Sequence, residues 1–420
     1  MAPSTRLVLF TGKGGVGKTT TAAATAVRAA REGVSTLILS TDAAHSLGDA
    51  LGVELAPGEA TQVAPQLHAL QVSAARRLDA SWRLVQDYLL EVLATVGVAP
   101  AVAEELTSLP GAEEVAALLE LRARAASGEW DLVVVDCAPT AESLRLLALP
   151  EALAWHLERL LPAQRGLLRT LRPAAAAAVG MPLPDPAVTA TVARWAREMR
   201  EVHALLTGDM ASVRLVLTPE RVVVAEARRA WTSLGLYGFT VDGVVVNRIL
   251  PSAGEPTTAP PVGEPSPRDW LTSWNAAQQA GLAEVRESFA GLPISRTPFL
   301  PEEPIGLDAL DELAELGGLG PLAPPAPTPD TRPGGLQVDR TRTGYRLRLP
   351  LPFVTADEVD LKRRESELIV AVGDHRRVLA LPAALTRCVV SAARVTGGRL
   401  VVDFVPDEAL WRPEAVTAGE

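Results

Sequence analysis

The chain of 420 residues is poor in cysteine, methionine, aromatic residues and lysine. Its two cysteines, Cys137 and Cys388, lie far apart and form no Cys-x-x-Cys pair. A disulfide framework and a cysteine-ligated zinc site therefore lack their residues. Cys137 follows an aspartate at the end of an apolar run, where a small semi-buried residue packs well, so we expect a structural rather than a redox role.

Long hydrophobic runs and an excess of positive charge are also absent. No apolar run reaches the roughly 18 residues of a membrane span, and no signal-peptide pattern precedes the first apolar run, so we expect a cytoplasmic protein without stable membrane insertion. The net charge of −10 argues against nucleic acid as a partner, because neutralising phosphates needs clustered cations. Apart from His45, the histidines show no shared ligand spacing and predict no metal site. They are His68, His156, His203 and His375.

Lysine is the scarcest charged residue, yet two of its three copies stand in one short loop. Lys13 and Lys18 belong to the segment Thr-Gly-Lys-Gly-Gly-Val-Gly-Lys-Thr-Thr at 11–20, whereas Lys362 stands alone. An apolar run at 6–10 reads as a buried strand, and the alanine-rich segment 19–31 reads as a helix. Strand, glycine loop and helix thus occur in the order that a phosphate-binding loop requires.

The residue types in this loop predict how a nucleotide is held. The glycines allow a tight turn whose N–H groups face phosphate oxygens at the positive end of a helix. Lys18 is expected to reach the β- and γ-phosphates, and the Thr19 hydroxyl to ligate Mg²⁺, so ATP and Mg²⁺ are the predicted cofactors. The predicted nucleotide-binding residues of the loop are Gly12, Gly14, Gly15, Val16, Gly17, Lys18, Thr19 and Thr20.

Two aspartates come after further apolar runs and complete the predicted site. Asp136 ends the run Leu-Val-Val-Val at 132–135, the Walker B arrangement, and is expected to hold the Mg²⁺ shell together with Thr19. Asp42 comes after the predicted strand 35–40, at the carboxyl edge where ligand-contacting residues of open α/β sheets gather. An isolated aspartate at a strand end is often only a cap, but the adjoining loop favours the functional interpretation.

Several motifs resemble one family of ATPases. A lysine five residues before the loop lysine is typical of the deviant P-loop class, which includes the ParA, MinD and nitrogenase iron-protein groups. The segments Asp-Ala-Ala-His-Ser at 42–46 and Asp-Cys-Ala-Pro-Thr at 136–140, continuing to Pro150, resemble the arsenite-pump (ArsA) and tail-anchored-protein targeting ATPases. Val-Val-Val-Asn at 244–247, with Thr-Pro-Glu at 218–220 before it, is similar to the adenine-binding strand end of that family. The resemblance spans residues 5 to 318.

The resemblance implies roles that the residues alone do not show. It makes Asp42 the carboxylate that orients the attacking water, and Asn247 a nucleotide-binding residue. Lys13 would reach the partner's phosphates across the interface of a homodimer, so the expected catalytic residues are Asp42, Lys13 and Lys18. His45 and Ser46 would belong to a switch loop, although Ser46 serves equally well as a helix cap.

The client of such an ATPase is the least determined part. An amphipathic stretch with leucines from 153 to 171 corresponds to the client groove of the targeting ATPases, but such a helix more often covers its own core. We expect a homodimeric Mg²⁺-ATPase that handles a hydrophobic or protein client. A catalytic subunit of an arsenite or anion efflux pump shares the nucleotide motifs but lacks the three thiolates. A positioning ATPase of the MinD or ParA kind would need a membrane-seeking helix or a basic face.

The sequence also departs from the family pattern in both switches. Ala43 replaces a proline in the first, and residues 141–143 replace glycine, histidine and threonine in the second. The coupling between nucleotide and switches is therefore expected to differ in detail.

The domain organisation is predicted from changes in composition. Residues 1–318 predict an α/β P-loop NTPase domain with a parallel sheet flanked by helices and a helical insertion at roughly 73–128 and 150–210. A proline-rich linker at 319–335 is expected to keep this body apart from the C-terminal residues. Short β-type runs at 336–406 predict a small β-sandwich, similar to the α-crystallin-like domain of some bacterial family members, although an unrelated sandwich would show the same pattern. Residues 407–420 form a tail.

Overall fold

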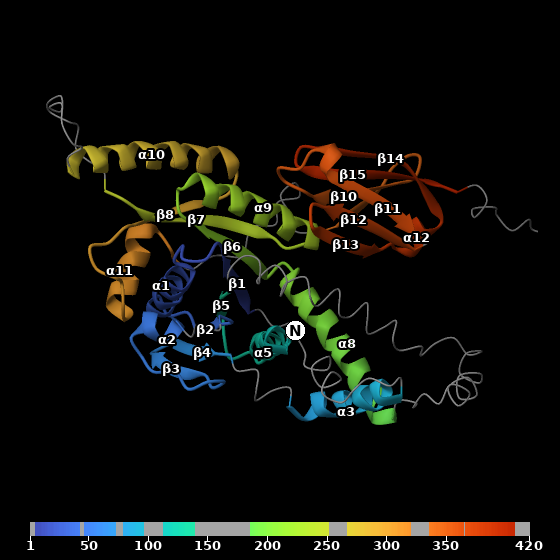
Figure 1. Ribbon diagram of the computed structural model, residues 1–420, viewed down its shortest axis with the longest axis horizontal. Coiled ribbons are helices and arrows are strands. Elements are labelled where there is room, and N and C mark those ends of the chain that lie inside the picture. Colours follow the sequence, from blue (N-terminus) through green and yellow to red (C-terminus); the bar gives the residue numbers. More distant parts are fainter. Residues whose placement is uncertain are drawn as a thin grey trace, which may run out of the picture.

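The molecule consists of a helix-flanked sheet and a smaller sandwich of strands (Figure 1). The computed structural model describes residues 5–42, 46–72, 79–95, 112–138, 185–251, 267–320, 336–364 and 366–407. Within these ranges the predicted fold class, a P-loop α/β domain followed by a β-sandwich, is confirmed.

One sheet of eight strands forms the centre of the larger body. The strand order is β3-β4-β2-β5-β1-β6-β7-β8, and every neighbouring pair is parallel except β3 with β4. The chain passes from β5 on one side of β1 to β6 on the other, so the carboxyl end of β1 lies where the strand order reverses, the usual place for a ligand. The strands are β1 Arg6–Thr11, β2 Thr36–Ser40, β3 Thr61–Ala64, β4 Leu67–Gln71, β5 Leu132–Asp136, β6 Ala211–Leu217, β7 Val241–Ile249 and β8 Ile294–Pro298.

Alternating side chains on the strands bury both faces of this sheet. In β1, Leu7 and Leu9 join one core, whereas Val8 and Phe10 join the other, as expected for a fully covered parallel strand. Helices α1 (Lys18–Arg31), α2 (Ser46–Leu51) and α11 (Leu307–Gly317) contribute to the core of Val8 and Phe10. The core of Leu7 and Leu9 is covered by α5 (Ala112–Ala126), α8 (Pro186–Leu206), α9 (Arg221–Tyr237) and α10 (Pro267–Ser288).

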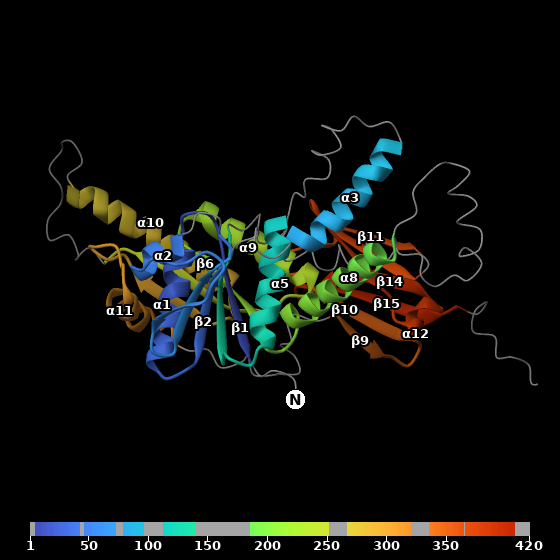
Figure 2. The ribbon, with the colours of Figure 1, turned by 90° about the horizontal axis from the view of Figure 1, so that it is seen from below.

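The predicted helical insertion is helical where it is described. Helix α3 (Asp79–Thr95) packs on α8 and projects away from the sheet (Figure 2), whereas α5 and α8 reach back to the sheet core through Leu118 and Met199. Asp185 caps α8 by accepting a hydrogen bond from Ala187 N at 2.7 Å, ahead of a proline in the first turn, a common start for a helix. The leucine-rich stretch from 153 to 171, interpreted above either as a client groove or, more often the case, as cover for its own core, lies outside the described residues.

The C-terminal sandwich consists of two antiparallel sheets. Their orders are β14-β15-β10-β9 and β11-β12-β13, and leucines, valines and Phe404 fill the space between them. The five short β-type runs of the sequence, at 345–349, 367–372, 377–381, 388–395 and 399–404, each form a strand, whereas β9 and β11 were not predicted. The elements are β9 Gln337–Arg340, β10 Tyr345–Pro350, β11 Val359–Arg364, β12 Glu367–Val372, β13 His375–Ala380, β14 Cys388–Thr396 and β15 Arg399–Pro406, with a 3₁₀ turn at Ala356–Glu358 and α12 at Ala383–Thr386.

The sandwich packs directly on α9, so the expectation that the linker keeps the two bodies apart is wrong. Phe353 has a left-handed backbone, with φ of 64°. Its ring lies 5.6 Å from Trp231 of α9 and 6.3 Å from Phe289 after α10. The Arg228 guanidinium lies 4.6 Å from the centre of the same ring, a cation–π distance. Burial of aromatic surface therefore joins the two bodies.

Polar contacts fix this docking more closely. Thr232 Oγ1 donates a hydrogen bond to Pro352 O at 2.5 Å, and Arg377 Nη1 donates to Leu236 O at 2.7 Å. A Cβ atom at Gly235 would lie 2.7 Å from Pro350 O, so only glycine allows the helix to approach this closely. Leu236 packs among the buried residues of the sandwich core. The final turns of α9 thus belong to both bodies.

Candidate nucleotide-binding site

The predicted phosphate loop joins the end of β1 to the start of α1, and two of its glycines are needed for packing. A Cβ atom at Gly12 would overlap the backbone of Val216 in β6. Gly17 has φ of 90°, and a Cβ atom there would overlap the amide of Asn247 in β7. Gly14 and Gly15 face open space. The loop is therefore seated on the carboxyl ends of two neighbouring strands and is open on the side where phosphates would lie.

Three elements meet in a small cluster of hydroxyl groups around Asp136. Thr19 Oγ1 of α1 donates to Asp136 Oδ2 at 2.9 Å, and Ser40 Oγ of β2 donates to the same oxygen at 3.1 Å. Ser46 Oγ, in the first turn of α2, lies 3.2 Å from Thr19 Oγ1. The loop-flanking helix α1, strand β5 and the start of α2 are thus connected through side chains.

The electrostatics of Asp136 indicate a cation site. Burial raises the pKa of this carboxyl to about 6, although the Thr19 and Ser40 hydroxyls and Lys18 oppose the shift. Among the residues that the structure describes, its second oxygen, Oδ1, is buried without a hydrogen-bond partner. A buried carboxylate in this condition is unfavourable unless a cation joins it. One carboxylate beside a hydroxyl matches the sparse protein coordination of Mg²⁺, which keeps waters and binds substrate phosphates.

Asp42 lies close to this cluster. Its backbone N donates to Ser40 Oγ at 3.2 Å, and its carbonyl accepts from Gln71 Nε2 at 2.8 Å. Its negative charge contributes to the raised pKa of Asp136. Ala43, Ala44 and His45 lie outside the described residues. The structure therefore places Asp42 at the cluster edge and leaves the predicted switch role of His45 untested.

The two loop lysines behave differently. Lys18 is buried, and its Nζ donates to Lys13 O at 3.4 Å, so its ammonium group stays inside the loop. The Lys13 side chain is 40% exposed, and its Nζ lies 3.8 Å from Glu226 Oε2 of α9. Lys13 is therefore accessible from outside its own loop, whereas Lys18 is not.

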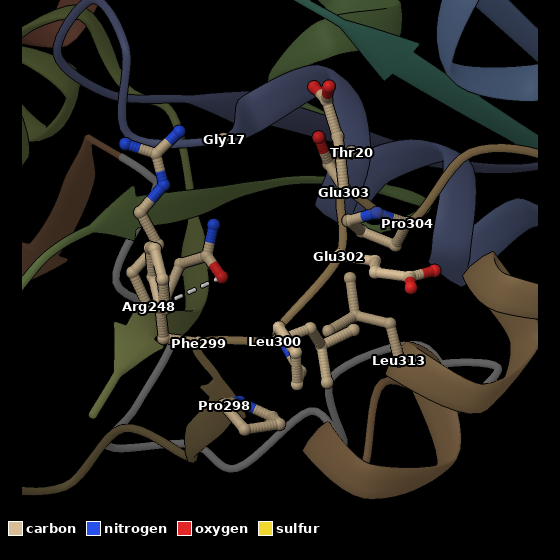
Figure 3. A pocket seen from close by; sticks show the side chains of 12 residues that line it. Gly17, Thr20, Arg248, Pro298, Phe299, Leu300, Glu302, Glu303, Pro304 and Leu313 are labelled. Atoms are coloured by element: carbon tan, nitrogen blue, oxygen red, sulfur yellow. Dashed lines mark hydrogen bonds between the residues drawn. The ribbon is translucent and has the colours of Figure 1, made fainter. Parts of the chain in front are cut away.

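A pocket of about 280 Å³ opens beside Gly17 and Thr20. Arg248 lies on the opposite side of this pocket from Glu302 and Leu313 (Figure 3). The segment from Pro298 to Pro304, after the edge strand β8, forms much of its wall. Sequence reasoning missed this segment; its signal was the cluster of three prolines shortly after helix α10.

Asn247 supports the loop as well as lining the pocket. Its Nδ2 donates to Val16 O at 2.9 Å, and its Oδ1 accepts from Thr297 Oγ1 at 2.6 Å and from Arg248 N at 2.9 Å. The side chain therefore ties the phosphate loop to β7 and β8. Sequence reasoning also missed Ser40 and Glu226. Ser40 was detectable as a hydroxyl at the end of a buried strand, but nothing in the sequence singled out Glu226.

The two cysteines belong to separate hydrophobic cores. Cys137 and Cys388 are both buried, one beside β1 and the other in the sandwich. In the described ranges no three histidine, cysteine or acidic side chains gather as metal ligands. Among the helices that the structure describes, none is long and apolar enough to cross a membrane.

Comparisons with known proteins agree with this geometry. Residues 5–316 match the family described as anion-transporting ATPase, and residues 342–404 match an HSP20-like domain found in ArsA. A protein of Chlorobaculum tepidum named as an arsenical pump-driving ATPase is 34% identical over 91% of each chain. One of Aquifex aeolicus with a similar name is 28% identical over 94% of this chain and 99% of its own. An ATPase ASNA1 homolog of Trypanosoma cruzi is 28% identical over 71% of this chain and 87% of its own. The chain therefore belongs to the ArsA ATPase family and is a P-loop ATPase with a C-terminal HSP20-like domain.

Proposed function

We propose that the protein is a homodimer that switches its shape through Mg²⁺-dependent ATP hydrolysis and acts on a hydrophobic or protein client. The observation that carries this proposal is the cluster in which Thr19, Ser46 and Asp136 meet. A metal held by Thr19 and Asp136 would lie beside Ser46, the first residue of α2, because Ser46 contacts Thr19. Loss of the γ-phosphate would then alter a contact between the loop and a switch segment.

The residues of the site divide the work of hydrolysis. Lys18 stabilises charge on the β- and γ-phosphates, and backbone N–H groups of the glycine loop bind phosphate oxygens. Mg²⁺, when bound, neutralises charge that develops on the transferred phosphoryl group. Asp42 orients water at the cluster edge. Asn247 and the pocket wall position the nucleoside, because this pocket continues directly from Gly17 and Thr20.

Lys13 acts on the nucleotide of the partner subunit in this proposal. Its exposure supports the idea, because a lysine serving its own phosphates would lie inside the loop as Lys18 does. A cation supplied from outside the site stabilises the transition state in the manner of an arginine finger.

The choice of client depends on the names of relatives and on the cysteines. The Trypanosoma cruzi relative is named an ASNA1 homolog, whereas other relatives are named for arsenical pumps. The two buried cysteines, located in different cores, do not offer the clustered thiolates that capture arsenite. We therefore favour a protein client and expect arsenite not to stimulate hydrolysis.

Lysine and aspartate variants test the chemistry. Lys18→Ala should abolish hydrolysis and the thermal stabilisation by ATP, while Lys362→Ala, at an exposed lysine paired with Asp360, should change neither. Asp42→Asn should retain ATP binding and lose hydrolysis, with exposed Asp49→Asn as its control. Near-normal turnover by Lys18→Ala would contradict the site, and loss of ATP binding by Asp42→Asn would show that Asp42 is structural.

Subunit mixing tests the dimer. Lys13→Ala and Asp42→Asn subunits, each inactive alone, should regain about a quarter of wild-type turnover when mixed equally, because half of randomly exchanged dimers are mixed and each has one complete site. Verified subunit exchange without recovered turnover would place Lys13 in its own site.

A further inference from the structure

Besides the nucleotide phosphates of the partner subunit, which are its proposed target, Lys13 has an anionic partner within its own subunit. Its ammonium group lies 3.8 Å from the carboxylate of Glu226, and the two side chains are 40% and 29% exposed. The backbone carbonyl of Lys13 accepts the hydrogen bond from Lys18 Nζ. The residue is therefore held at two points, by the loop lysine through its backbone and by α9 through its side chain.

Glu226 stands on a helix that is fixed from both sides. Val224 and Ala227 bury the neighbouring turn against the sheet core, and Thr232 and Leu236 bond to the sandwich further along the same helix. The phosphate loop is not anchored to α9 in this way. Because these contacts fix α9, a change in the distance between Glu226 and Lys13 would come from the loop or from the two side chains.

The neighbouring cation Arg228 is engaged elsewhere. Arg228, two residues further along α9, lies 3.9 Å from Glu284 of α10 and covers the ring of Phe353. Residues two apart on a helix point in different directions, so Arg228 belongs to the sandwich side and Glu226 to the nucleotide side. Within the described part of the chain, Lys13 is the cation that forms an ion pair with Glu226.

We propose that Glu226 is a positioning residue. It holds the side chain of Lys13 within its own subunit while the site lacks nucleotide, and the phosphates of a bound nucleotide replace Glu226 as the partner of Lys13. This inference rests on the proposed role of Lys13 at the phosphates. A lysine ammonium carries one charge and cannot serve both partners at full strength. The Glu226 pair is exposed and therefore weak, so a phosphate cluster with Mg²⁺ wins the competition. Glu226 thus sets the nucleotide concentration at which Lys13 leaves the ion pair and contacts phosphates.

Removing the Glu226 charge should make the active arrangement easier to reach. Glu226→Gln is expected to lower the KM for ATP by up to about five-fold, the factor that corresponds to an exposed ion pair of about 1 kcal/mol. The maximal rate should not fall, because Glu226 touches neither substrate nor metal in this proposal. Glu284→Gln is the matched control, since that carboxylate is 34% exposed and its pair with Arg228 is equally long. It should leave the KM unchanged.

A double-mutant cycle separates this role from a general effect of charge. ATP affinity, measured with a fluorescent ATP analogue, should rise in Glu226→Gln and should not respond to the same change in a Lys13→Ala background. With Lys13 present, the difference in ATP affinity between wild type and Glu226→Gln should shrink when the ionic strength is raised to about 1 M, because exposed ion pairs are screened by salt. A gain that persists without Lys13, a loss of affinity or an unchanged KM would each overturn the proposal. Absence of ATP hydrolysis in the wild type would instead contradict the proposed function.

Discussion

Two buried aspartates stand at opposite edges of the same sheet, and their surroundings differ in kind. Asp136 ends β5 at the carboxyl edge, where two hydroxyl groups donate to one oxygen and the other oxygen has no partner within the described part of the chain. Asp242, near the start of β7, lies 3.0 Å from Arg6 Nη2 and 3.3 Å from Arg214 Nη2, and accepts from Ser212 Oγ at 2.7 Å. One carboxylate receives cations from the chain itself, and the other is left with an oxygen free for a ligand.

The difference separates stability from function. At the amino edge, burial lowers the pKa of Arg6 and Arg214 while Asp242 opposes that shift, so the carboxylate helps to keep both arginines charged. At the carboxyl edge the sheet buries a carboxylate whose pKa is raised and whose Oδ1 is unpartnered among the described residues. We infer that the first edge contributes to folding and the second accepts a metal at some cost to folding.

The largest expected effect is on catalysis at the carboxyl edge. Asp136→Asn keeps the size of the side chain and removes its charge, so hydrolysis should fall by at least about a hundred-fold. Stability without magnesium should not fall, since an unfavourable buried charge disappears. Steady-state turnover and chemical denaturation of the same preparation measure both quantities. A stability loss comparable with the activity loss would show that the two edges do not differ in kind.

The next effect is on folding at the amino edge. Asp242→Asn leaves two buried arginines without their carboxylate and should destabilise the protein by about 3–5 kcal/mol. Turnover per folded molecule should stay near that of wild type, because none of the proposed nucleotide-binding residues lies at this edge. Denaturant unfolding gives the stability, and ATP titration of the folded fraction gives the rate. Loss of hydrolysis in fully folded protein would reveal coupling between the edges.

Stability without magnesium should depend on pH through Asp136. Its pKa is about 6 in the folded protein against 3.8 for an ordinary aspartate, so the folded state binds the proton more tightly. The resulting stabilisation is complete below pH ~4 and is lost as the pH rises through 6, with a total change of about 3 kcal/mol. The stability difference between wild type and Asp136→Asn, measured from pH 5 to pH 8, should therefore widen by about 1.5 kcal/mol.

Magnesium provides the control for that measurement. Millimolar Mg²⁺ with nucleotide should reduce the widening, because a bound cation favours the charged carboxylate. If the two proteins differ by the same amount at every pH, the pKa of Asp136 is not raised and the comparison between the edges fails.

The smallest effects come from a matched pair of hydroxyl groups. Ser212→Ala and Ser40→Ala each remove one hydrogen bond to a buried aspartate, and each should cost about 1–2 kcal/mol of stability. Only Ser40→Ala should also weaken the apparent affinity for Mg²⁺ in the hydrolysis assay, because it alters the carboxylate that we propose as the metal ligand. Equal magnesium dependence in the two variants would remove the distinction at this finer level.

Much of this arrangement could be predicted from local sequence, and the remainder depends on distant contacts. The phosphate loop, the flanking strand and helix and the five sandwich strands carry short-range patterns of apolar residues and glycine. Asn247 was expected near the nucleotide from its motif, but its bond to Val16 O spans 231 residues and has no local signal. Strand β11 has alternating exposure with charged residues in every outward position, so its apolar pattern is too weak to detect.

The docking of the sandwich illustrates the same limit. Proline content predicted a spacer between the bodies. Their association instead depends on Trp231 and Gly235 of α9, which meet the segment around Phe353 much later in the chain, and each of these residues is individually ordinary. Glu226 was missed for this reason too, because a glutamate on a helix is usually solvated and only its distance to Lys13 distinguishes it.

The close fit of Gly235 against Pro350 has a consequence for how such proteins can recombine. A gene fusion or exchange made within the proline-rich segment would transfer the sandwich without the helix surface that receives it. Trp231, Gly235 and Leu236 would then face a foreign partner, and the approach of the two backbones, too close for a Cβ atom at Gly235, leaves no space to adapt. The unit that can be transferred between proteins is therefore discontinuous in sequence. It comprises the last two turns of α9 together with the sandwich, and substitutions in one segment require matching substitutions in the other.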